Sequence, residues 1–82
     1  MAIEEVTPEQ AAEWLTWSRQ GVRGYKVRGF VKDMDAGKWD ANSRSRPVIV
    51  DERRKRLENG NHRLTAVVEH GQPVAMQVRR KT

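Results

Sequence analysis

Residues 59–78 read NGNHRLTAVVEHGQPVAMQV, and this stretch determines the fold that we predict for the chain. Its first two residues, an Asn-Gly pair, indicate a turn. The apolar residues after the turn recur with helical spacing, which predicts a helix over 62–70 that stops at Gly71. Alternating apolar residues then predict a closing strand over 74–78. A turn, a helix and a returning strand in this order are typical of domains in which helices pack on a sheet.

Upstream of this stretch, the chain alternates between strand and helix patterns. The sequence Thr7-Pro8-Glu9-Gln10 is typical of a helix start: Thr7 caps the helix, Pro8 takes its first position and Gln10 closes the capping box. We expect a strand over 2–6, a helix from 7 to around 19–21, a second helix over 26–36, and strands over 47–50 and 56–58. These elements predict a single α+β domain over residues 1–82, with about three helices packed on a small mixed sheet.

Apolar residues on one face of each predicted element form the expected core. The predicted core residues are Trp14, Leu15, Trp17, Phe30, Val31, Met34, Leu64, Val67 and Val68. Trp39 follows Gly37, which we expect to end the second helix, and an aromatic residue in this position usually folds back onto the core. We therefore interpret the three tryptophans as core residues rather than as platforms on which bases stack.

The composition excludes several classes of site. The chain contains no cysteine, which excludes disulfide bonds, thiolate catalysis and cysteine-ligated zinc. Its two histidines, His62 and His70, have no acidic partner at ligand spacing, so we expect no metal site. No apolar run approaches the length of about 18 residues that a membrane span needs, and the acidic N-terminus is unlike a signal peptide. We therefore expect a soluble, cytoplasmic protein without a membrane partner.

Basic residues outnumber acidic ones and are unevenly distributed. Sixteen Lys and Arg against eleven Asp and Glu give a net charge of +5, and residues 1–18 contain no basic residue at all. A positive field of this kind attracts phosphate-bearing partners. The predicted nucleic-acid-binding residues are Arg44, Arg46, Arg53, Arg54, Lys55 and Arg56. The alternative is that the charges only maintain solubility and that 53–56 form a solvated hairpin turn.

The turn before the third predicted helix is the candidate functional site. A helix start exposes backbone N–H groups and the positive end of the helix dipole, which together favour an anion. A glycine there lets the backbone approach a phosphate, and an arginine adds a bidentate contact. The candidate phosphate- or nucleotide-binding residues are Gly60, Asn61, His62 and Arg63. In the structural alternative, Gly60 or Asn61 caps the helix, His62 faces solvent, and Arg63 pairs with Glu58 or Asp51.

The segment Gly60-Asn61-His62-Arg63-Leu64-Thr65-Ala66 resembles the G-x-x-R-x-x-A box of ParB-type N-terminal domains, which it matches at Gly60, Arg63 and Ala66. It also resembles the G-C-H-R element of sulfiredoxins, which it matches at Gly60, His62 and Arg63. The stretches TPEQA (7–11) and DMDAGKW (33–39) look like small ParB-like proteins that phages and mobile elements often encode. The resemblance extends over most of residues 5–80. It implies a ParB/sulfiredoxin-like domain in the cytoplasm of a bacterial or phage-infected cell.

In these families the box binds a phosphate, of CTP in ParB and of ATP in sulfiredoxin. The resemblance implies that Gly60 and Arg63 meet the phosphate, that His62 is an accessory contact, and that CTP or ATP with magnesium is the ligand to test. Sulfiredoxin's nucleophilic cysteine falls on Asn61, so thiol chemistry is excluded. The Glu-Arg pair of ParB's usual box falls on Asn61 and His62, which argues against CTP hydrolysis. The 82 residues contain no counterpart of ParB's DNA-binding helix-turn-helix or of its dimerisation tail, so we expect a solitary domain.

We therefore expect a ParB-like module that binds DNA or a nucleotide through the turn and the basic residues around it, without catalysis. The alternative is a phage or mobile-element protein that uses a degenerate form of the fold to bind and modulate a host protein. Nuclease or CTPase activity is implied by the resemblance alone, because no acidic residues have a spacing that guarantees convergence on a metal ion. A homodimer formed through a strand edge or the first helix is also left open.

Overall fold

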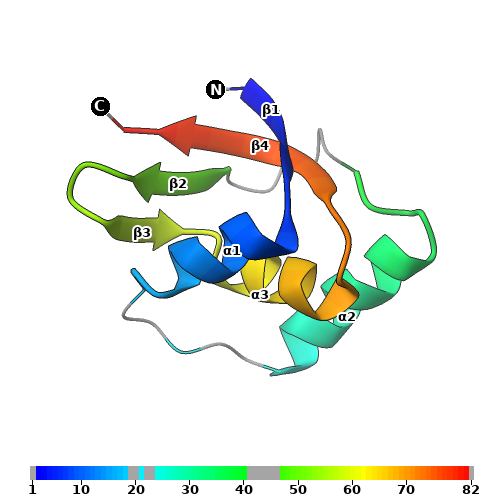
Figure 1. Ribbon diagram of the computed structural model, residues 1–82. Coiled ribbons are helices and arrows are strands. Elements are labelled where there is room, and N and C mark those ends of the chain that lie inside the picture. Colours follow the sequence, from blue (N-terminus) through cyan, green and yellow to red (C-terminus); the bar gives the residue numbers. More distant parts are fainter. Residues whose placement is uncertain (1, 19–20, 22–23, 41–46, 82) are drawn as a thin grey trace.

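The computed structural model describes residues 2–18, 21, 24–40 and 47–81. Within these residues it contains three helices and a four-stranded mixed sheet. Along the chain the elements are β1 (Ala2–Val6), α1 (Pro8–Leu15), α2 (Gly24–Asp35), β2 (Val48–Asp51), β3 (Arg56–Asn59), α3 (Asn61–His70) and β4 (Val74–Arg80). The predicted α+β class, with three helices packed on a small mixed sheet, is confirmed (Figure 1).

The sheet has the strand order β1-β4-β2-β3. β4 is antiparallel to β1 and parallel to β2, and β2 and β3 form an antiparallel hairpin. The parallel pairing sets Val50 of β2 beside Arg80 of β4, so these two strands end at the same side of the sheet. The β2–β3 turn and the last residues of β4 therefore lie near each other, on the left in Figure 1. The other end of β3 leads directly into α3.

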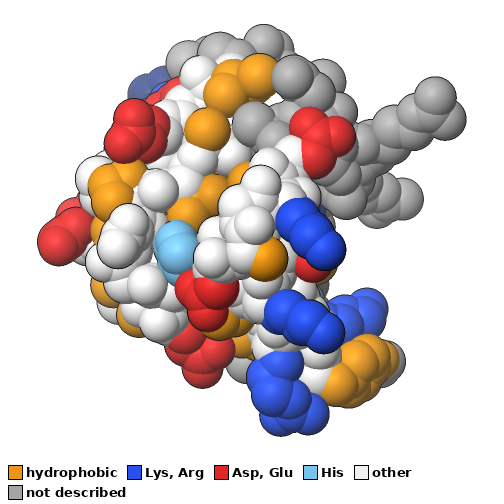
Figure 2. Space-filling model, turned by 90° about the vertical axis from the view of Figure 1, so that its right-hand side faces the viewer, with side chains coloured by type: hydrophobic (Ala, Val, Ile, Leu, Met, Phe, Trp, Pro, Cys, Tyr) orange, Lys and Arg blue, Asp and Glu red, His pale blue; other side chains and the backbone are white. Residues whose placement is uncertain are grey.

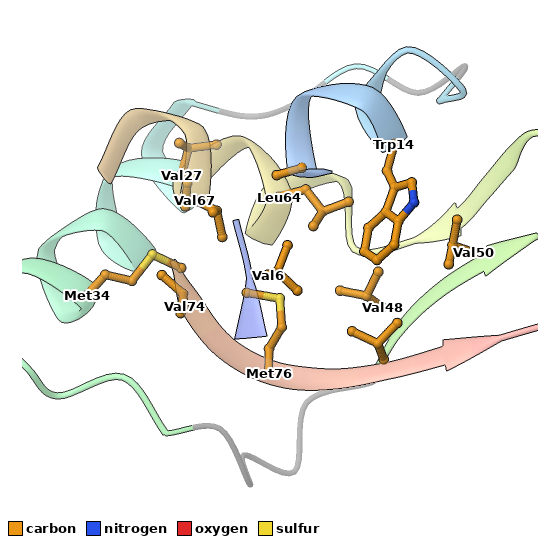
Figure 3. Close-up of a cluster of buried hydrophobic side chains, with 13 residues drawn as sticks. Val6, Trp14, Val27, Met34, Val48, Val50, Leu64, Val67, Val74 and Met76 are labelled. Carbon is orange, nitrogen blue, oxygen red and sulfur yellow. The ribbon is translucent and has the colours of Figure 1, made fainter. Parts of the chain in front are cut away.

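The core is the layer between the helices and one face of the sheet (Figure 3). The predicted alternation along the last strand is confirmed, because Val74, Met76 and Val78 are buried. The other buried apolar residues are Val6, Ala11, Trp14, Val27, Met34, Val48, Val50, Leu64, Ala66 and Val67. Burying one large apolar side chain contributes about 1.5–3 kcal/mol, so this layer is the main source of stability. The remaining predicted core residues of α1 and α2, together with Trp17 and Trp39, are partly buried against it.

Helix α1 begins as predicted, with Thr7 as its N-cap. The prediction that the helix reaches residues 19–21 is wrong, because α1 ends at Leu15. Beyond this point the backbone hydrogen bonds span three residues instead of four. The carbonyl of Trp17 then accepts a bond from the backbone N–H of Leu57 in β3 (3.4 Å), so the chain turns towards the sheet instead of continuing the helix.

Helix α2 ends as predicted at a glycine, since Gly37 has a positive φ of 70°. Its first residue is Gly24, two residues before the predicted start. The prediction that Trp39 folds back is confirmed: its ring meets that of Phe30 edge-on, with the centroids 5.5 Å apart. The indole N–H of Trp39 donates to the carbonyl of Ala75 in β4 (2.9 Å). This contact fixes the segment after α2 to the sheet.

Helix α3 packs between α1 and α2, and this packing corrects one core prediction. Val68 is not buried, because 39% of its surface is exposed. The buried face of α3 is centred on Val67 and extends to Ala66, the side that faces α2. Arg63 precedes Ala66 by almost one helical turn, so the same packing draws Arg63 partly into the protein.

Candidate phosphate-binding site

Gly60 joins β3 to α3 in a backbone conformation that favours glycine, with a φ of 107°. A Cβ atom at this position would lie 2.7 Å from Cγ2 of Val48 and 3.2 Å from its Cα. Because Val48 is fully buried in the core, it has no free space into which to move. Gly60 therefore has a structural role: it allows α3 to start in close contact with β2.

The first turn of α3 has no side-chain cap, because its N-cap residue is Gly60. The backbone N–H of Leu64 donates to the carbonyl of Gly60 (2.9 Å), so the amides before Leu64 have no acceptor within the helix. Asn61 is buried, and its side-chain amide donates to the carbonyl of Gly21 (3.2 Å). The side chain of Asn61 thus joins the segment before α2 to the start of α3.

Arg63 is partly buried on the side of α3 that faces α2. Burial lowers the pKa of its guanidinium below the ordinary value, because the charged form loses hydration. The alternative partners that the sequence offered are engaged elsewhere: Glu58 pairs with Lys81 (2.7 Å), and the carboxylate of Asp51 accepts the backbone N–H of Arg54 (3.0 Å). Among the described residues, no carboxylate forms an ion pair with Arg63.

These residues surround a hollow of about 150 Å³, which we name the helix pocket. It is lined by Lys26, Phe30, Asn59, Gly60, Asn61, His62 and Arg63. The four residues predicted from the turn therefore come together, and α2 adds Lys26 and Phe30. The lining includes two cations, Lys26 and Arg63, and no acidic residue, so the pocket favours an anion.

Lys26 is a residue of the helix pocket that the sequence analysis missed. It belongs to α2, on which Arg28 and Lys32 are also exposed. Figure 2 looks at the side of the molecule on which α2 lies and shows Lys and Arg side chains gathered on part of that face. The basic composition of α2 was visible in the sequence. Its contact with the turn was not, because it depends on how α2 packs on α3.

The predicted basic residues do not surround the helix pocket. Arg53, Arg54 and Lys55 lie in the β2–β3 turn and Arg56 begins β3. β3 separates them from Gly60, and a four-residue strand spans about 13 Å. Arg44 and Arg46, which complete the predicted set, lie outside the described residues.

A second hollow, of about 470 Å³, lies where the β2–β3 turn approaches the end of β4, and we name it the sheet-end pocket. It is lined by Asp51, Arg53, Arg54, Arg79, Arg80 and Lys81. The sequence analysis did not place the basic residues of the β2–β3 turn beside those at 79–81. No local pattern indicates their proximity, because it results from the parallel pairing of β2 and β4.

Arg80 lines the sheet-end pocket and is held by two carboxylates. Its Nε and Nη2 donate to Glu4 (3.1 and 2.8 Å), its Nη1 donates to Glu52, and its guanidinium lies 5.2 Å from the ring centroid of Trp14. The hydrogen bonds to Glu4 are the main cause that raises the pKa of Arg80, and they also lower the pKa of Glu4. Arg80 is therefore a structural cation.

A third hollow, of about 590 Å³, lies elsewhere, between α2 and α3. Its lining is Arg28, Val31, Lys32, Asp35, Ala36 and Glu69. Two bases and two acids share this lining, so it lacks the one-sided charge of the other two hollows. We therefore do not place the functional site there.

Two further findings concern metal ions and membranes. Across residues 2–18, 21, 24–40 and 47–81, no group of three or more His, Asp or Glu side chains is arranged to hold a metal ion. None of the helices in this part of the chain combines the length and apolar character needed to cross a membrane.

The chain was compared with models of known protein families, with curated proteins and with solved structures, and none of the three comparisons found a match. The resemblance to ParB-type domains and sulfiredoxins therefore stays a prediction from the residues of the turn.

Proposed function

We propose that this protein is a ParB-like phosphate-binding module, without catalysis, whose helix pocket receives a phosphate group of a nucleic acid or of a nucleotide. The observation that carries the proposal is the state of Arg63, a partly buried cation with no ion-pair partner among the described residues. Burying a charge without compensation is unfavourable, and a bound anion would supply the missing countercharge.

The surroundings of Arg63 support the same ligand. The start of α3 directs the positive end of its dipole at the pocket, and Gly60 adds no side chain that would cover it. Lys26 supplies a second cation from α2. A guanidinium, an ammonium and a helix start converge in this way on phosphate oxygens in many anion sites.

The size of the pocket bears on how much of the ligand enters it. Pockets that enclose small molecules usually measure about 300–1,000 Å³, whereas the helix pocket measures about 150 Å³. The space suits one phosphate group, with the sugar and base outside. Without a carboxylate in the lining, magnesium would have to arrive with the phosphates of a nucleotide and be held by them and by water.

The proposal is tested by two-dimensional amide NMR titration of the ¹⁵N-labelled chain with inorganic phosphate, CTP, ATP and a short DNA duplex, the nucleotides with magnesium. We expect shifts centred on residues 60–63 and on Lys26. Arg63→Met should abolish these shifts, because methionine keeps an apolar side chain but carries no charge. Arg28→Met, which removes an exposed arginine of the same face of the molecule, should retain them.

Two outcomes would overturn this function. One is a spectrum that stays unchanged at millimolar ligand and low salt. The other is an identical set of shifts in Arg63→Met, because binding would then occur elsewhere on the basic surface.

A further inference from the structure

The sheet-end pocket is assembled from two segments that lie far apart in the sequence. Asp51 ends β2, Arg53 and Arg54 lie in the β2–β3 turn, and residues 79–81 lie at and just after the end of β4. The backbone N–H of Lys81 donates to the carbonyl of Val50 (2.9 Å), which fixes the end of β4 against β2. Segments 51–58 and 79–81 together contain seven basic and three acidic residues, so positive charge is concentrated here.

Some cations of this region form ion pairs within the protein, and others do not. Arg80 is engaged by Glu4 and Glu52, and Lys81 by Glu58. Arg53, Arg54 and Arg79 are exposed and form no ion pair with any described residue. These three guanidinium groups therefore remain to bind an external anion.

Contacts with the rest of the fold hold parts of the pocket in place. Arg80 donates three hydrogen bonds to two carboxylates and lies over the buried ring of Trp14. These contacts hold the end of β4, and with it the backbone of the neighbouring Arg79. In the turn, the carboxylate of Asp51 accepts the backbone N–H of Arg54 (3.0 Å). Preorganisation of this kind reduces the entropy lost on binding.

The chemistry of the lining indicates the class of ligand. All six lining residues are charged, and none is apolar or aromatic. Protein interfaces usually centre on apolar or aromatic anchors, and single-stranded nucleic acids bind by stacking their bases on aromatic rings. A duplex presents a continuous row of phosphates on its outside and is held mainly by Lys and Arg.

We propose that the sheet-end pocket binds the phosphate backbone of double-stranded nucleic acid, through Arg53, Arg54 and Arg79 and without reading base sequence. The proposal goes beyond the phosphate site at α3 and does not rest on it. The two pockets lie at opposite ends of β3, so each can be tested while the other is intact.

The test is fluorescence anisotropy with labelled 16-base-pair DNA and RNA duplexes and with the matching single strands, between about 50 and 200 mM salt. The test variant carries Arg53→Gln, Arg54→Gln and Arg79→Gln. The control carries Arg28→Gln, Lys32→Gln and Lys38→Gln, which remove the same charge from exposed positions away from the pocket. Circular dichroism checks that both variants fold.

We expect the test variant to bind duplexes at least tenfold more weakly at low salt. Its log–log salt dependence should be shallower by about 2–3, since each phosphate contact contributes about 0.9 to the slope. The control should stay within about threefold of the original chain. Binding to either duplex supports the proposal, and the tighter one identifies the nucleic acid.

The proposal would be overturned by equal losses in the test and control variants, by single strands that bind more tightly than duplexes, or by the absence of salt-dependent binding. Competition by poly-glutamate at equal charge concentration would also overturn it, because any polyanion, including an acidic protein, would then suffice.

Discussion

Arg63 in the first turn of α3 and Arg80 at the end of β4 lie in opposite electrostatic environments. Arg80 is paired with Glu4 and Glu52, and these contacts raise the pKa of its guanidinium. Arg63 has no ion-pair partner among the described residues, and burial lowers its pKa. Arg80 thus stabilises the fold. The partial burial of Arg63 is unfavourable for its charge, and a bound anion could offset this loss of hydration. The number of arginines in the sequence does not show which of them are paired within the protein.

The largest effect should come from Gly60, on which the helix pocket is built. Gly60→Ala should lower the free energy of unfolding by about 3 kcal/mol, because a positive φ and a close contact with Val48 both act against a Cβ atom. A chain of this length has a total stability on the order of 4–12 kcal/mol, so partial unfolding is expected. Urea unfolding followed by circular dichroism measures the change.

Gly71→Ala is the matched control for this change. Gly71 also has a positive φ, of 79°, but no atom lies within 4 Å of the position of an added Cβ. Its loss should be about 1 kcal/mol, from the backbone alone. Equal losses at the two glycines would show that the contact between Gly60 and Val48 is unimportant.

The second prediction compares the two arginines directly. Arg80→Met should lower the free energy of unfolding by about 1–2 kcal/mol, because it leaves Glu4 and Glu52 unpaired and removes the cation from the Trp14 ring. Arg63→Met should change it by less than about 0.5 kcal/mol, since the lost contacts are offset by removal of a partly buried charge. Both are measured by urea unfolding at pH 7. If Arg63→Met were the more damaging of the two, Arg63 would be a structural residue.

The third prediction concerns the side chain that joins the helix pocket to the preceding segment. Asn61→Ala should cost about 1 kcal/mol, because the carbonyl of Gly21 loses the amide that donates to it. Urea unfolding tests this, with Asn59→Ala as a control that removes a comparable bond to the carbonyl of Pro47 (2.9 Å). A loss at Asn59 but none at Asn61 would mean that the bond to Gly21 adds no stability.

The smallest effect is a change in the free energy of unfolding at acidic pH, caused by the pair of Glu4 and Arg80. The pKa of Glu4 in the folded chain is below its ordinary value of 4.5, chiefly because of the hydrogen bond from Arg80. Between these two values the unfolded chain binds more protons, so stability falls as the pH falls through that window. The pair is partly exposed, so its contribution should be below about 1 kcal/mol.

Urea midpoints at pH 7, 5, 4 and 3 measure this dependence, and Glu4→Gln is the comparison variant. The variant should be less stable at pH 7 and lose less on acidification. Arg63 should add nothing to the profile, because arginine stays charged throughout this range. An identical acid response in both chains would contradict the role assigned to the Glu4–Arg80 pair.

Features that depend on neighbouring residues were predictable from the sequence. Thr7 caps α1, glycines follow α2 and α3, and the buried side chains of β4 alternate, as local stereochemistry requires. The turn at residues 59–63 could also be identified, since an Asn-Gly pair and a following helical pattern are local signals. The seven helices and strands in the described part of the chain were therefore expected near their observed positions.

Features that depend on distant partners were not predictable. α1 ends early where Trp17 bonds to β3, and Val68 is exposed because α2 covers the other side of α3. The spacing of apolar residues defines the apolar face of a helix, but it does not show which side of that face a neighbouring helix will cover. Both errors thus arose where long-range packing overrode a correct local pattern.

The sequence by itself determined the class of fold, the approximate positions of its elements and the turn that leads into α3, because capping, turn preference and periodicity act within a few residues. Only the tertiary structure decided which cations have partners. The pairing of β4 with β1 and β2 brings Arg80 within reach of Glu4 and Glu52, and the packing of α2 on α3 sets Lys26 beside Arg63. Electrostatic roles depend on distances between atoms, and the fold sets those distances for residues as far apart as 4 and 80.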